Sequence, residues 1–145
     1  MLFRSSHHNL KIEMENNLPP VRVDEKAVAE VLYLLLENAA KYSPPATDII
    51  VSARKTADNM LKISVQDHGI GIPPALWEKV FEKFFRSADI ASENVRSGLG
   101  MGLAIARGIV EAHKGKIWIE TESGARGTRV SFVLPLGEQV AEKVS

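Results

Sequence analysis

The segment Met60-Leu-Lys-Ile-Ser-Val-Gln-Asp-His-Gly-Ile-Gly71 alternates apolar and polar residues and then runs into two glycines. A period of two predicts a strand, and Leu61, Ile63 and Val65 would share the face that packs against the core. Asp67 continues that face, so its carboxylate is expected on the covered side of the sheet. A buried carboxylate needs hydrogen-bond donors. These could come from its own turn, or from a ligand that the glycines allow to approach closely.

Other segments carry the same signal for extended chain, each bounded by proline, glycine or polar residues. One of them, at the N-terminal end, alternates in the manner of a half-buried strand. A polar turn, Ala57-Asp-Asn59, would join the segment before Met60 to the strand that starts there. The further strands expected are Leu10–Met14, Asp48–Lys55, Lys116–Thr121 and Thr128–Leu134.

Helical spacing of apolar residues predicts two longer helices and one short helix. The first follows Asp24, a good N-cap, and presents a single apolar stripe to the core. The second opens in a glycine-rich stretch, and Gly115 is expected as its C-terminal stop. The polar segment Ser87–Ser97 has no apolar periodicity, and a loop of roughly a dozen residues inside a compact domain is often a functional lid. The helices expected are Glu25–Tyr42, Ala75–Val80 and the run from Gly98–Gly102 to Lys114.

These elements predict an α+β fold: a two-layer sandwich with one mixed sheet of about five strands and about three helices on one face. We expect one domain over residues 10–136. Residues 1–9 would be an N-terminal extension, and residues 137–145 a polar C-terminal tail.

The composition is that of a single globular domain. The chain has 145 residues, of which 45% are apolar and 25% charged, with a formal net charge of +0 and no cysteine. The charge balance gives no reason to expect nucleic acid or an anionic membrane as a partner. Disulfides and thiolate zinc sites are excluded. No apolar run approaches the ~20 residues of a bilayer span, and residues 1–8 carry no secretory signal.

At about 100° per residue, Leu34, Asn38 and Lys41 fall together along one edge of the apolar stripe of the first helix. An asparagine carbonyl is a hard ligand that suits Mg²⁺, and a lysine one turn away could contact a phosphate. An asparagine bonded within the core and a solvated lysine would explain the same two residues. Both interpretations stay open on these residues alone.

The stretch Gly98-Leu-Gly-Met-Gly102 precedes a helix and has glycine at alternate positions. Free backbone N–H groups at the positive end of a helix can bind phosphate, although linkers and turns produce the same pattern. It does not match the dinucleotide-binding fingerprint, since Leu103 stands where the third glycine is needed. The common NTPase loop is also excluded, since no Gly-Lys-Ser/Thr follows.

Together, five motifs in this order closely resemble the ATP-binding domain of sensor histidine kinases, a family grouped with the gyrase, Hsp90 and MutL ATPases. The resemblance covers residues 10–136 and implies a Bergerat-type ATP-binding fold. The motifs are Leu36-Glu-Asn-Ala-Ala-Lys-Tyr42, Asp67-His-Gly-Ile-Gly-Ile-Pro73, Phe81-Glu-Lys-Phe-Phe-Arg86, Gly98-Leu-Gly-Met-Gly-Leu-Ala-Ile-Ala106 and Gly124-Ala-Arg-Gly-Thr128.

The resemblance also implies a role for each motif. Asn38 would bind a Mg²⁺ that bridges the ATP phosphates, Lys41 would contact those phosphates, and Arg86 would approach the γ-phosphate. Asp67 would accept a hydrogen bond from the adenine amino group. The remaining implied contacts are Tyr42, Gly69, Gly71, Ile72 and Thr128 near the adenine, and Gly98, Gly100, Gly102 and Leu103 at the phosphates.

Leu34 departs from the family pattern, which usually has a second asparagine at this position. Hydrolysing relatives place a general-base glutamate there. Leucine neither binds metal nor activates water, so it counts against a self-contained ATPase and makes Mg²⁺ binding a point to test. The stretch Asn17–Asp24 is similar to that of Kdp-type potassium sensor kinases.

The resemblance implies a two-component phosphorelay. The domain would transfer the γ-phosphoryl group of ATP to a histidine on a separate dimerisation domain, and so indirectly to a response regulator. None of His8, His68 and His113 has the expected sequence context of that acceptor. The alternatives are an ATPase of the same superfamily and a non-catalytic nucleotide-binding module. The fragment would be the cytoplasmic part of a membrane-bound receptor, monomeric in isolation, with no nucleic acid partner and no membrane insertion of its own.

Overall fold

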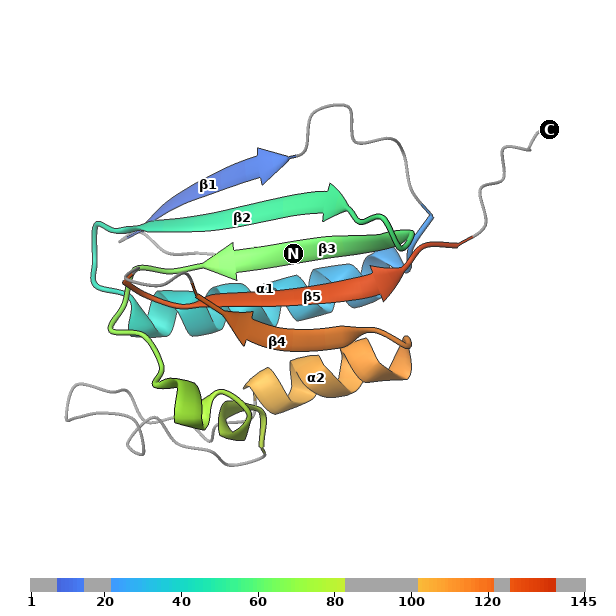
Figure 1. Cartoon of the computed structure of the whole chain (residues 1–145). Helices are drawn as coiled ribbons and strands as arrows, with labels where there is room; N and C mark the ends of the chain where they lie inside the picture. The colour runs from blue at the N-terminus through green and yellow to red at the C-terminus, as the bar shows by residue number, and fades with distance from the viewer. Residues whose placement is uncertain (1–7, 15–21, 83–101, 122–125, 138–145) are drawn as a thin grey trace.

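The computed structural model describes residues 8–14, 22–82, 102–121 and 126–137, with the exception of the Tyr42 side chain. Five strands form one sheet in the order β1-β2-β3-β5-β4 (Figure 1). In chain order the elements are β1 (Asn9–Met14), α1 (Glu25–Tyr42), β2 (Asp48–Lys55), β3 (Met60–Gln66), the 3₁₀ helices η1 (Pro74–Leu76) and η2 (Lys79–Phe81), α2 (Gly102–Ala112), β4 (Lys116–Glu120) and β5 (Arg129–Pro135).

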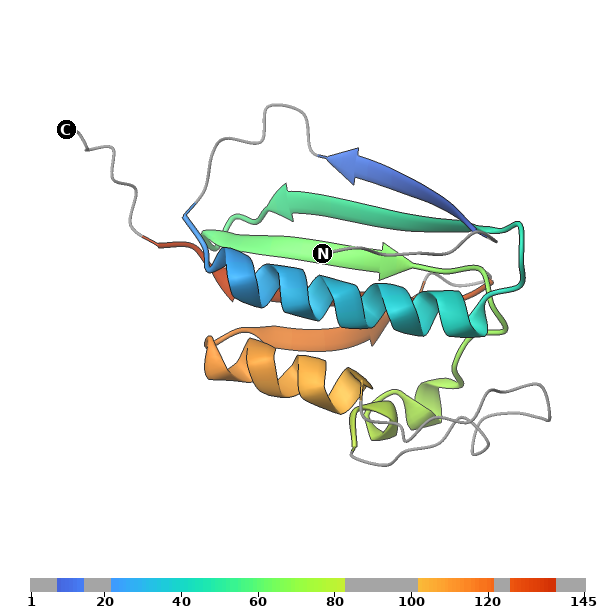
Figure 2. The same ribbon diagram turned by 180° about the vertical axis from the view of Figure 1, so that it is seen from behind.

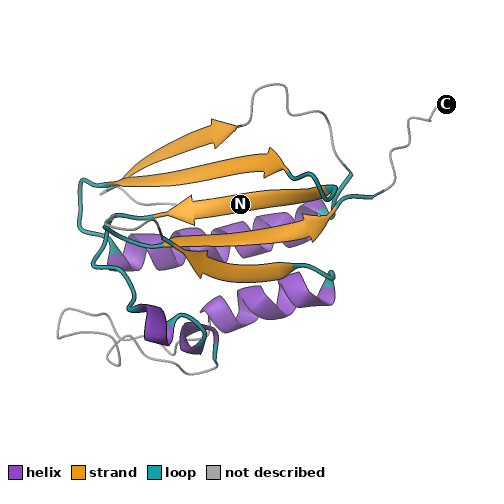
Figure 3. Cartoon of the chain, viewed as in Figure 1, coloured by secondary structure: helices purple, strands orange, loops and turns teal. Residues whose placement is uncertain are grey.

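The sheet is mixed because β1 and β2 are parallel, whereas the other neighbouring strands are antiparallel. Parallel strands need a crossover, and α1 supplies it. Both α-helices lie on the same face of the sheet (Figure 2, Figure 3). The α+β two-layer fold expected from the sequence is therefore confirmed. The helix expected over Ala75–Val80 is instead split into η1 and η2, since so short a segment favours isolated 3₁₀ turns over a cooperative α-helix.

The core lies between the sheet and the helices. The apolar face of β3 is buried as the alternation predicted, and the helical stripes pack against it. On the described part of the chain, no helix is long and apolar enough to cross a bilayer. The residues that form the core on the central strand and the two helices are Leu61, Ile63, Val65, Val31, Leu35, Ala39, Leu103, Ala106 and Val110.

Strand β1 differs from the prediction of a half-buried strand. All six of its residues are exposed, including Leu10, Ile12 and Met14. Figure 2 shows the reason: neither helix lies over this edge of the sheet. Alternation predicted which face carries the apolar side chains, but it could not show whether a helix reaches that face.

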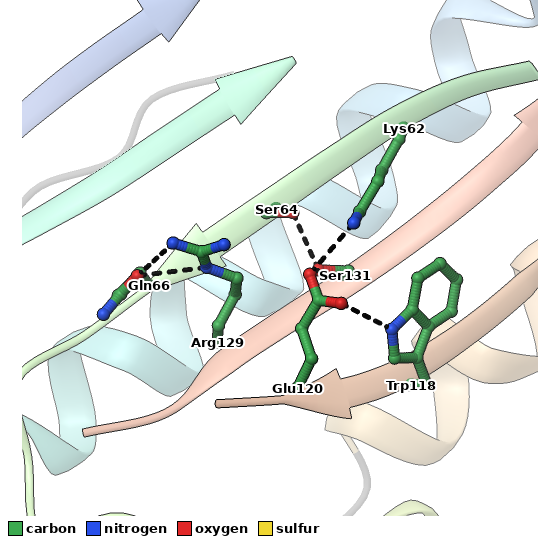
Figure 4. Close-up of polar contacts among 7 residues, drawn as sticks. All are labelled: Lys62, Ser64, Gln66, Trp118, Glu120, Arg129 and Ser131. Carbon is green, nitrogen blue, oxygen red and sulfur yellow. Dashed lines mark hydrogen bonds and ion pairs between the residues drawn. The ribbon is translucent and has the colours of Figure 1, made fainter. Parts of the chain in front are cut away.

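The helix-free face of the sheet carries a polar network (Figure 4). Ser64 and Ser131, both buried, are joined by a hydrogen bond of 2.7 Å. Ser131 also donates to Glu120, which accepts from the Trp118 indole and pairs with Lys62 at 3.0 Å. Burial raises the pKa of Glu120, but the three donors outweigh it and the net pKa is lowered. The network links β3, β4 and β5.

The two α-helices are tied together at one end through Asp24 and His113. The Oδ1 of Asp24 accepts from the backbone N–H of Ala27 at 3.1 Å, which confirms the N-cap. The Oδ2 of Asp24 lies 2.8 Å from His113 Nε2, while His113 Nδ1 lies 2.8 Å from the carbonyl of Ile109. Both partners are acceptors, so the protonated ring can donate to both of them. The Ile109 carbonyl and Asp24 accordingly raise the pKa of His113.

This tie joins the start of α1 to the end of α2, so the end of α1 and the start of α2 lie at the opposite end of the domain (Figure 2). The carboxyl end of β3 reaches the same end as the carboxyl end of α1 (Figure 1). Motifs far apart in sequence are thereby brought to one end of the sandwich.

At the end of α2, the structure differs from the prediction that Gly115 is the C-terminal stop of the helix. The left-handed residue is Lys114, at φ 65°, and not Gly115. The N–H of Lys114 donates to the Glu111 carbonyl and that of Gly115 to the Val110 carbonyl, which is a Schellman ending. Gly115 is required for space, because a Cβ there would lie 2.0 Å from the carbonyl oxygen of Val133.

Gly127 is pressed against the backbone that follows β3. Its φ is +96°, and a Cβ there would lie 2.1 Å from the carbonyl oxygen of Asp67. On its other side, the carbonyl oxygen of Gly127 lies 3.2 Å from where a Cβ of Gly71 would be. The turn before β5 is therefore packed between the end of β3 and the loop that contains Gly69 and Gly71. Only a residue without a side chain fits at position 127.

We predict that Gly127→Ala destabilises the domain by about 2 kcal/mol or more, from the positive φ and the collision with Asp67. Gly108→Ala is the matched control, since Gly108 lies in α2 and a Cβ there would have no neighbour within 4 Å. That control should be neutral or stabilising by up to about 1 kcal/mol. Urea unfolding followed by circular dichroism measures both. Equal stability of Gly127→Ala and the parent would contradict the close packing.

Candidate functional site

Asp67 follows β3 directly and is bound by backbone groups from two other parts of the chain. Its Oδ1 accepts from the N–H of Gly69 at 2.9 Å and from the N–H of Thr128 at 3.1 Å. Its own N–H donates to the carbonyl of Thr128 at 2.9 Å. Asp67 and Thr128 are both buried, with 7% and 6% of their surface exposed. The predicted burial of the carboxylate is confirmed, and backbone N–H groups supply the donors that it needs.

The second carboxylate oxygen of Asp67 is in a different situation. Within the described residues, Oδ2 makes no hydrogen bond. Burial raises the pKa of Asp67, while the N–H groups of Gly69 and Thr128 and the nearby His68 act in the opposite direction. A hydrogen-bond donor from a ligand would satisfy Oδ2 and stabilise the ionised form. The backbone groups of Gly69 and Thr128 bond only one of the two carboxylate oxygens of Asp67, Oδ1.

Two side chains to which the sequence assigned no role at the site position the loop after Asp67. The Nδ1–H of His68 donates to the carbonyl of Asp48 at 2.8 Å, which ties the loop to the start of β2. The indole N–H of Trp77 donates to the carbonyl of Ile72 at 2.7 Å. Ile72 packs against the core, so its position is held from both sides. The sequence signal for this contact was a tryptophan that lies five residues after Ile72, beyond two prolines.

On α1, Asn38 and Lys41 lie in the last two turns, with Leu34 one turn before Asn38. Asn38 is partly buried, and its side chain makes no hydrogen bond to another residue in the described ranges. Leu34 is partly buried against the core, and Lys41 is exposed. The neighbouring Glu37 is exposed and accepts from the Tyr33 hydroxyl at 2.8 Å.

Protein groups alone do not build a metal centre in the part of the chain that the structure describes. No three His, Cys, Asp or Glu side chains cluster there. Asn38 is an isolated oxygen donor. It fits Mg²⁺ only if phosphate oxygens and water complete the coordination, which is how Mg²⁺ is commonly held beside nucleotides.

The start of α2 is where the sequence predicts a phosphate site. Gly102 is the first described residue of the helix, and no side chain of the described residues lies within 4 Å of where its Cβ would be. Leu103 is buried and fixes this end of the helix in the core. Arg86, Gly98, Gly100 and the expected lid lie outside the described residues.

The Phe-rich motif begins with a structural anchor. Phe81 is buried, and the Arg107 guanidinium of α2 lies 5.7 Å from the centre of its ring. Arg107 also pairs with Glu111 at 3.1 Å. The 3₁₀ helix η2, which contains Phe81, is thus fixed to α2. The expected phosphate site lies at the start of α2.

Around Asp67 the structure brings together Gly69, Gly71 and Thr128, as the predicted site requires. Gly127 belongs to this group, although no role was predicted for it beyond its place in the last motif. In the sequence, the Gly127-Thr128 pair immediately before the final strand was the feature that could have indicated this position. Asn38 and Lys41 lie in the last turns of α1, and the carboxyl end of α1 lies at the same end of the domain as the carboxyl end of β3 (Figure 1).

Comparison with known proteins agrees with this arrangement. The family model described as "Histidine kinase-, DNA gyrase B-, and HSP90-like ATPase" matches residues 23–138. The sensor histidine kinase WalK of Bacillus subtilis (strain 168) is 40% identical over 133 residues, covering 88% of this chain and 21% of WalK. The methanogenesis regulatory histidine kinase FilI of Methanothrix harundinacea (strain 6Ac) is 44% identical over 128 residues, covering 87% of this chain and 14% of FilI.

Solved structures share the fold. The mycobacterial sensor histidine kinase MprB superposes with a TM-score of 0.75 at 30% identity, covering 91% of this chain and 86% of that one. Full-length ShkA in complex with AMPPNP gives a TM-score of 0.78 at 23% identity, covering 91% of this chain and 26% of that one.

The chain spans only about a fifth or less of the length of WalK and FilI. Each of these comparisons covers most of this chain, and the family match begins at residue 23, just before α1. The chain belongs to the histidine kinase-, DNA gyrase B- and HSP90-like ATPase family, as the ATP-binding catalytic domain of a sensor histidine kinase.

Proposed function

We propose that this domain binds ATP with its adenine at Asp67 and transfers the γ-phosphoryl group to a histidine on a separate dimerisation domain. The observation that supports this most directly is the buried carboxylate of Asp67, which two backbone donors fix through Oδ1 and whose Oδ2 accepts no hydrogen bond from the described residues. Adenine presents an amino group as donor, whereas guanine presents a carbonyl at the same ring position. A fixed acceptor therefore favours adenine.

The residues around Asp67 give this site its shape. Gly69 donates to Asp67, Gly71 has a φ of +88° that favours glycine, and Ile72 is held beside the core by the Trp77 indole. Thr128 holds the carboxylate from the opposite side of the turn. We assign Tyr42 to the same end of the site from its place at the end of α1.

The phosphates would lie between the end of α1 and the start of α2. Lys41 supplies positive charge, and Gly102 and Leu103 begin a helix whose N–H groups favour an anion. Asn38 would hold Mg²⁺, which neutralises charge on the phosphates when it is bound. Arg86, Gly98 and Gly100 complete the proposed set from their positions in the motifs.

These residues act by positioning and charge neutralisation, which is the main demand of phosphoryl transfer. Leu34 is packed against the core and has no group that could remove a proton from water. This favours transfer to an external acceptor over hydrolysis, so we rank an ATPase second and a nucleotide-sensing module third.

The partners follow from the same proposal. They are a dimerisation domain that carries the acceptor histidine and a response regulator that receives the phosphoryl group. We place the domain on the cytoplasmic side of a membrane-bound receptor, where ATP is available. A Kdp-type input, suggested by the resemblance of Asn17–Asp24, remains a prediction.

Asp67→Asn tests the adenine contact with little change of shape. The amide oxygen can keep both bonds to Gly69 and Thr128, while the amide nitrogen places a donor against the adenine amino group. We expect ATP affinity to fall about 5- to 150-fold, the equivalent of ~1–3 kcal/mol. Calorimetric titration measures the effect. The control ligand is purine riboside triphosphate, which lacks the amino group and should lose much less.

A loss that is equal for ATP and the purine nucleotide would show a general disturbance of the site. Unchanged ATP affinity would exclude Asp67 from adenine recognition. Either result would overturn the assignment.

Transfer itself is tested with γ-labelled ATP and a dimerisation domain from a related sensor kinase. The chain should transfer phosphate in trans and give an acid-labile, alkali-stable product, as phosphohistidine is. Asn38→Ala should abolish transfer by removing the Mg²⁺ ligand, and Arg86→Ala should slow it while ATP affinity stays nearly intact. Glu37→Ala is the matched control on α1, because Glu37 faces solvent.

Two outcomes would favour the other functions. Rapid phosphate release by the chain alone would indicate an ATPase. Tight ATP binding with neither transfer nor release would indicate a nucleotide-sensing module.

A further inference from the structure

Strand β1 leaves one edge of the sheet open. Its only neighbour in the described sheet is β2 (Figure 1). The N–H of Asn9 donates to the carbonyl of Thr47 on the β2 side at 3.3 Å. Backbone groups alternate in direction along an extended strand, so those of Lys11 and Glu13 also face β2. The N–H and C=O groups of Leu10, Ile12 and Met14 therefore point outward, toward no other strand of the described sheet.

The same three residues carry exposed apolar side chains. Leu10, Ile12 and Met14 are 43%, 65% and 55% exposed. In the register with β2 they stand beside Ile49, Val51 and Ala53, so they share the helix-bearing face of the sheet. An edge strand with an uncovered apolar row is unusual, because natural proteins protect such edges with charge, proline or a covering helix. The row indicates a surface that is covered in an assembly.

The order of residues in β1 indicates what covers it. Leu10-Lys-Ile-Glu-Met14 is self-complementary when a second copy runs antiparallel to it. With Ile12 opposite Ile12 of the other copy, Lys11 lies opposite Glu13 and Leu10 opposite Met14. By symmetry, Glu13 lies opposite Lys11 of the other copy, and Met14 lies opposite Leu10. This register also places each outward-facing residue against an outward-facing residue, as an antiparallel ladder requires.

We propose that two copies of this chain pair through their β1 strands, antiparallel about Ile12, and join their sheets across a two-fold axis. The ladder would satisfy the outward backbone groups of Leu10, Ile12 and Met14 in both copies. The same contact is used by both copies, so it is isologous and closes as a dimer.

The charges favour this partner over an unrelated strand. Lys11 and Glu13 would be non-hydrogen-bonded pairs, in which side chains across the ladder come closest. Glu13 has no ion pair with any residue in the described ranges. Lys11 pairs with Asp48 at 3.1 Å, and its side chain is 58% exposed, so it can also reach a carboxylate of the second copy.

The size of the contact makes it weak. Six residues a copy bury much less than the ~800 Å² per partner of a standard stable interface. The chain should be monomeric when dilute, as the sequence led us to expect, and dimeric only at high concentration. Where two catalytic domains are tethered in one assembly, their effective concentration reaches the millimolar range and favours the contact.

Sedimentation equilibrium from about 10 µM to about 2 mM tests the proposal, since weak association falls in this range. The average mass of the parent should rise toward that of a dimer. Glu13→Lys places like charges opposite each other twice in the dimer and should weaken association at least about tenfold. Glu30→Lys is the matched control, with the same change of charge on an exposed position of α1, and should leave association unchanged.

Exchanging the two charges, Lys11→Glu with Glu13→Lys, should restore association to within a few-fold of the parent. Amide exchange at Ile12 should slow with concentration in the parent and not in Glu13→Lys. The proposal is overturned if the parent stays monomeric throughout. It is equally overturned if Glu13→Lys and Glu30→Lys have the same effect, or if the charge exchange fails to restore association while the variant remains folded.

Discussion

The arrangement at the functional end depends on one constraint, the fixing of Asp67 by two backbone N–H groups from different segments. Gly69 donates from the loop that follows, and Thr128 donates from the turn before β5. This pair of hydrogen bonds to Oδ1 orients the carboxylate and holds three chain segments together. Gly127 makes the arrangement possible, since any side chain there would collide with the backbone of Asp67.

In the proposed binding mode, adenine recognition and phosphate chemistry would be supported by different layers of the fold. The adenine would lie at the end of the sheet, where Asp67 and Thr128 are joined by a backbone hydrogen bond. The phosphates would lie at the two helices, which are joined by the Asp24–His113 contact at their far end. A change in the helical layer can therefore alter phosphate geometry while adenine recognition is retained. That division suits a kinase whose acceptor arrives on another domain.

Much of this could be predicted from the sequence wherever the signal is local. Alternation in Met60–Gln66 located the central strand and the burial of Asp67, and helical periodicity located α1 with its cap. Contacts between distant segments could not be predicted in this way. The packing of the layers decides whether a helix covers β1. It also decides that Gly127 packs against Asp67 and that Gly115 packs against Val133. The ligand contacts assigned to every site residue stay predictions, and Arg86, Gly98 and Gly100 also lie outside the described residues.

If the carboxylate of Asp67 recognises adenine, it should do so without help from the phosphates. Titration with adenosine, followed by the ¹⁵N–¹H signals of the backbone, tests this most directly. The amide signals of Gly69 and Thr128 should shift and saturate with adenosine alone, because their N–H groups share the carboxylate that the base contacts. Signals that stay still with adenosine and move only when the triphosphate is present would contradict adenine recognition by Asp67.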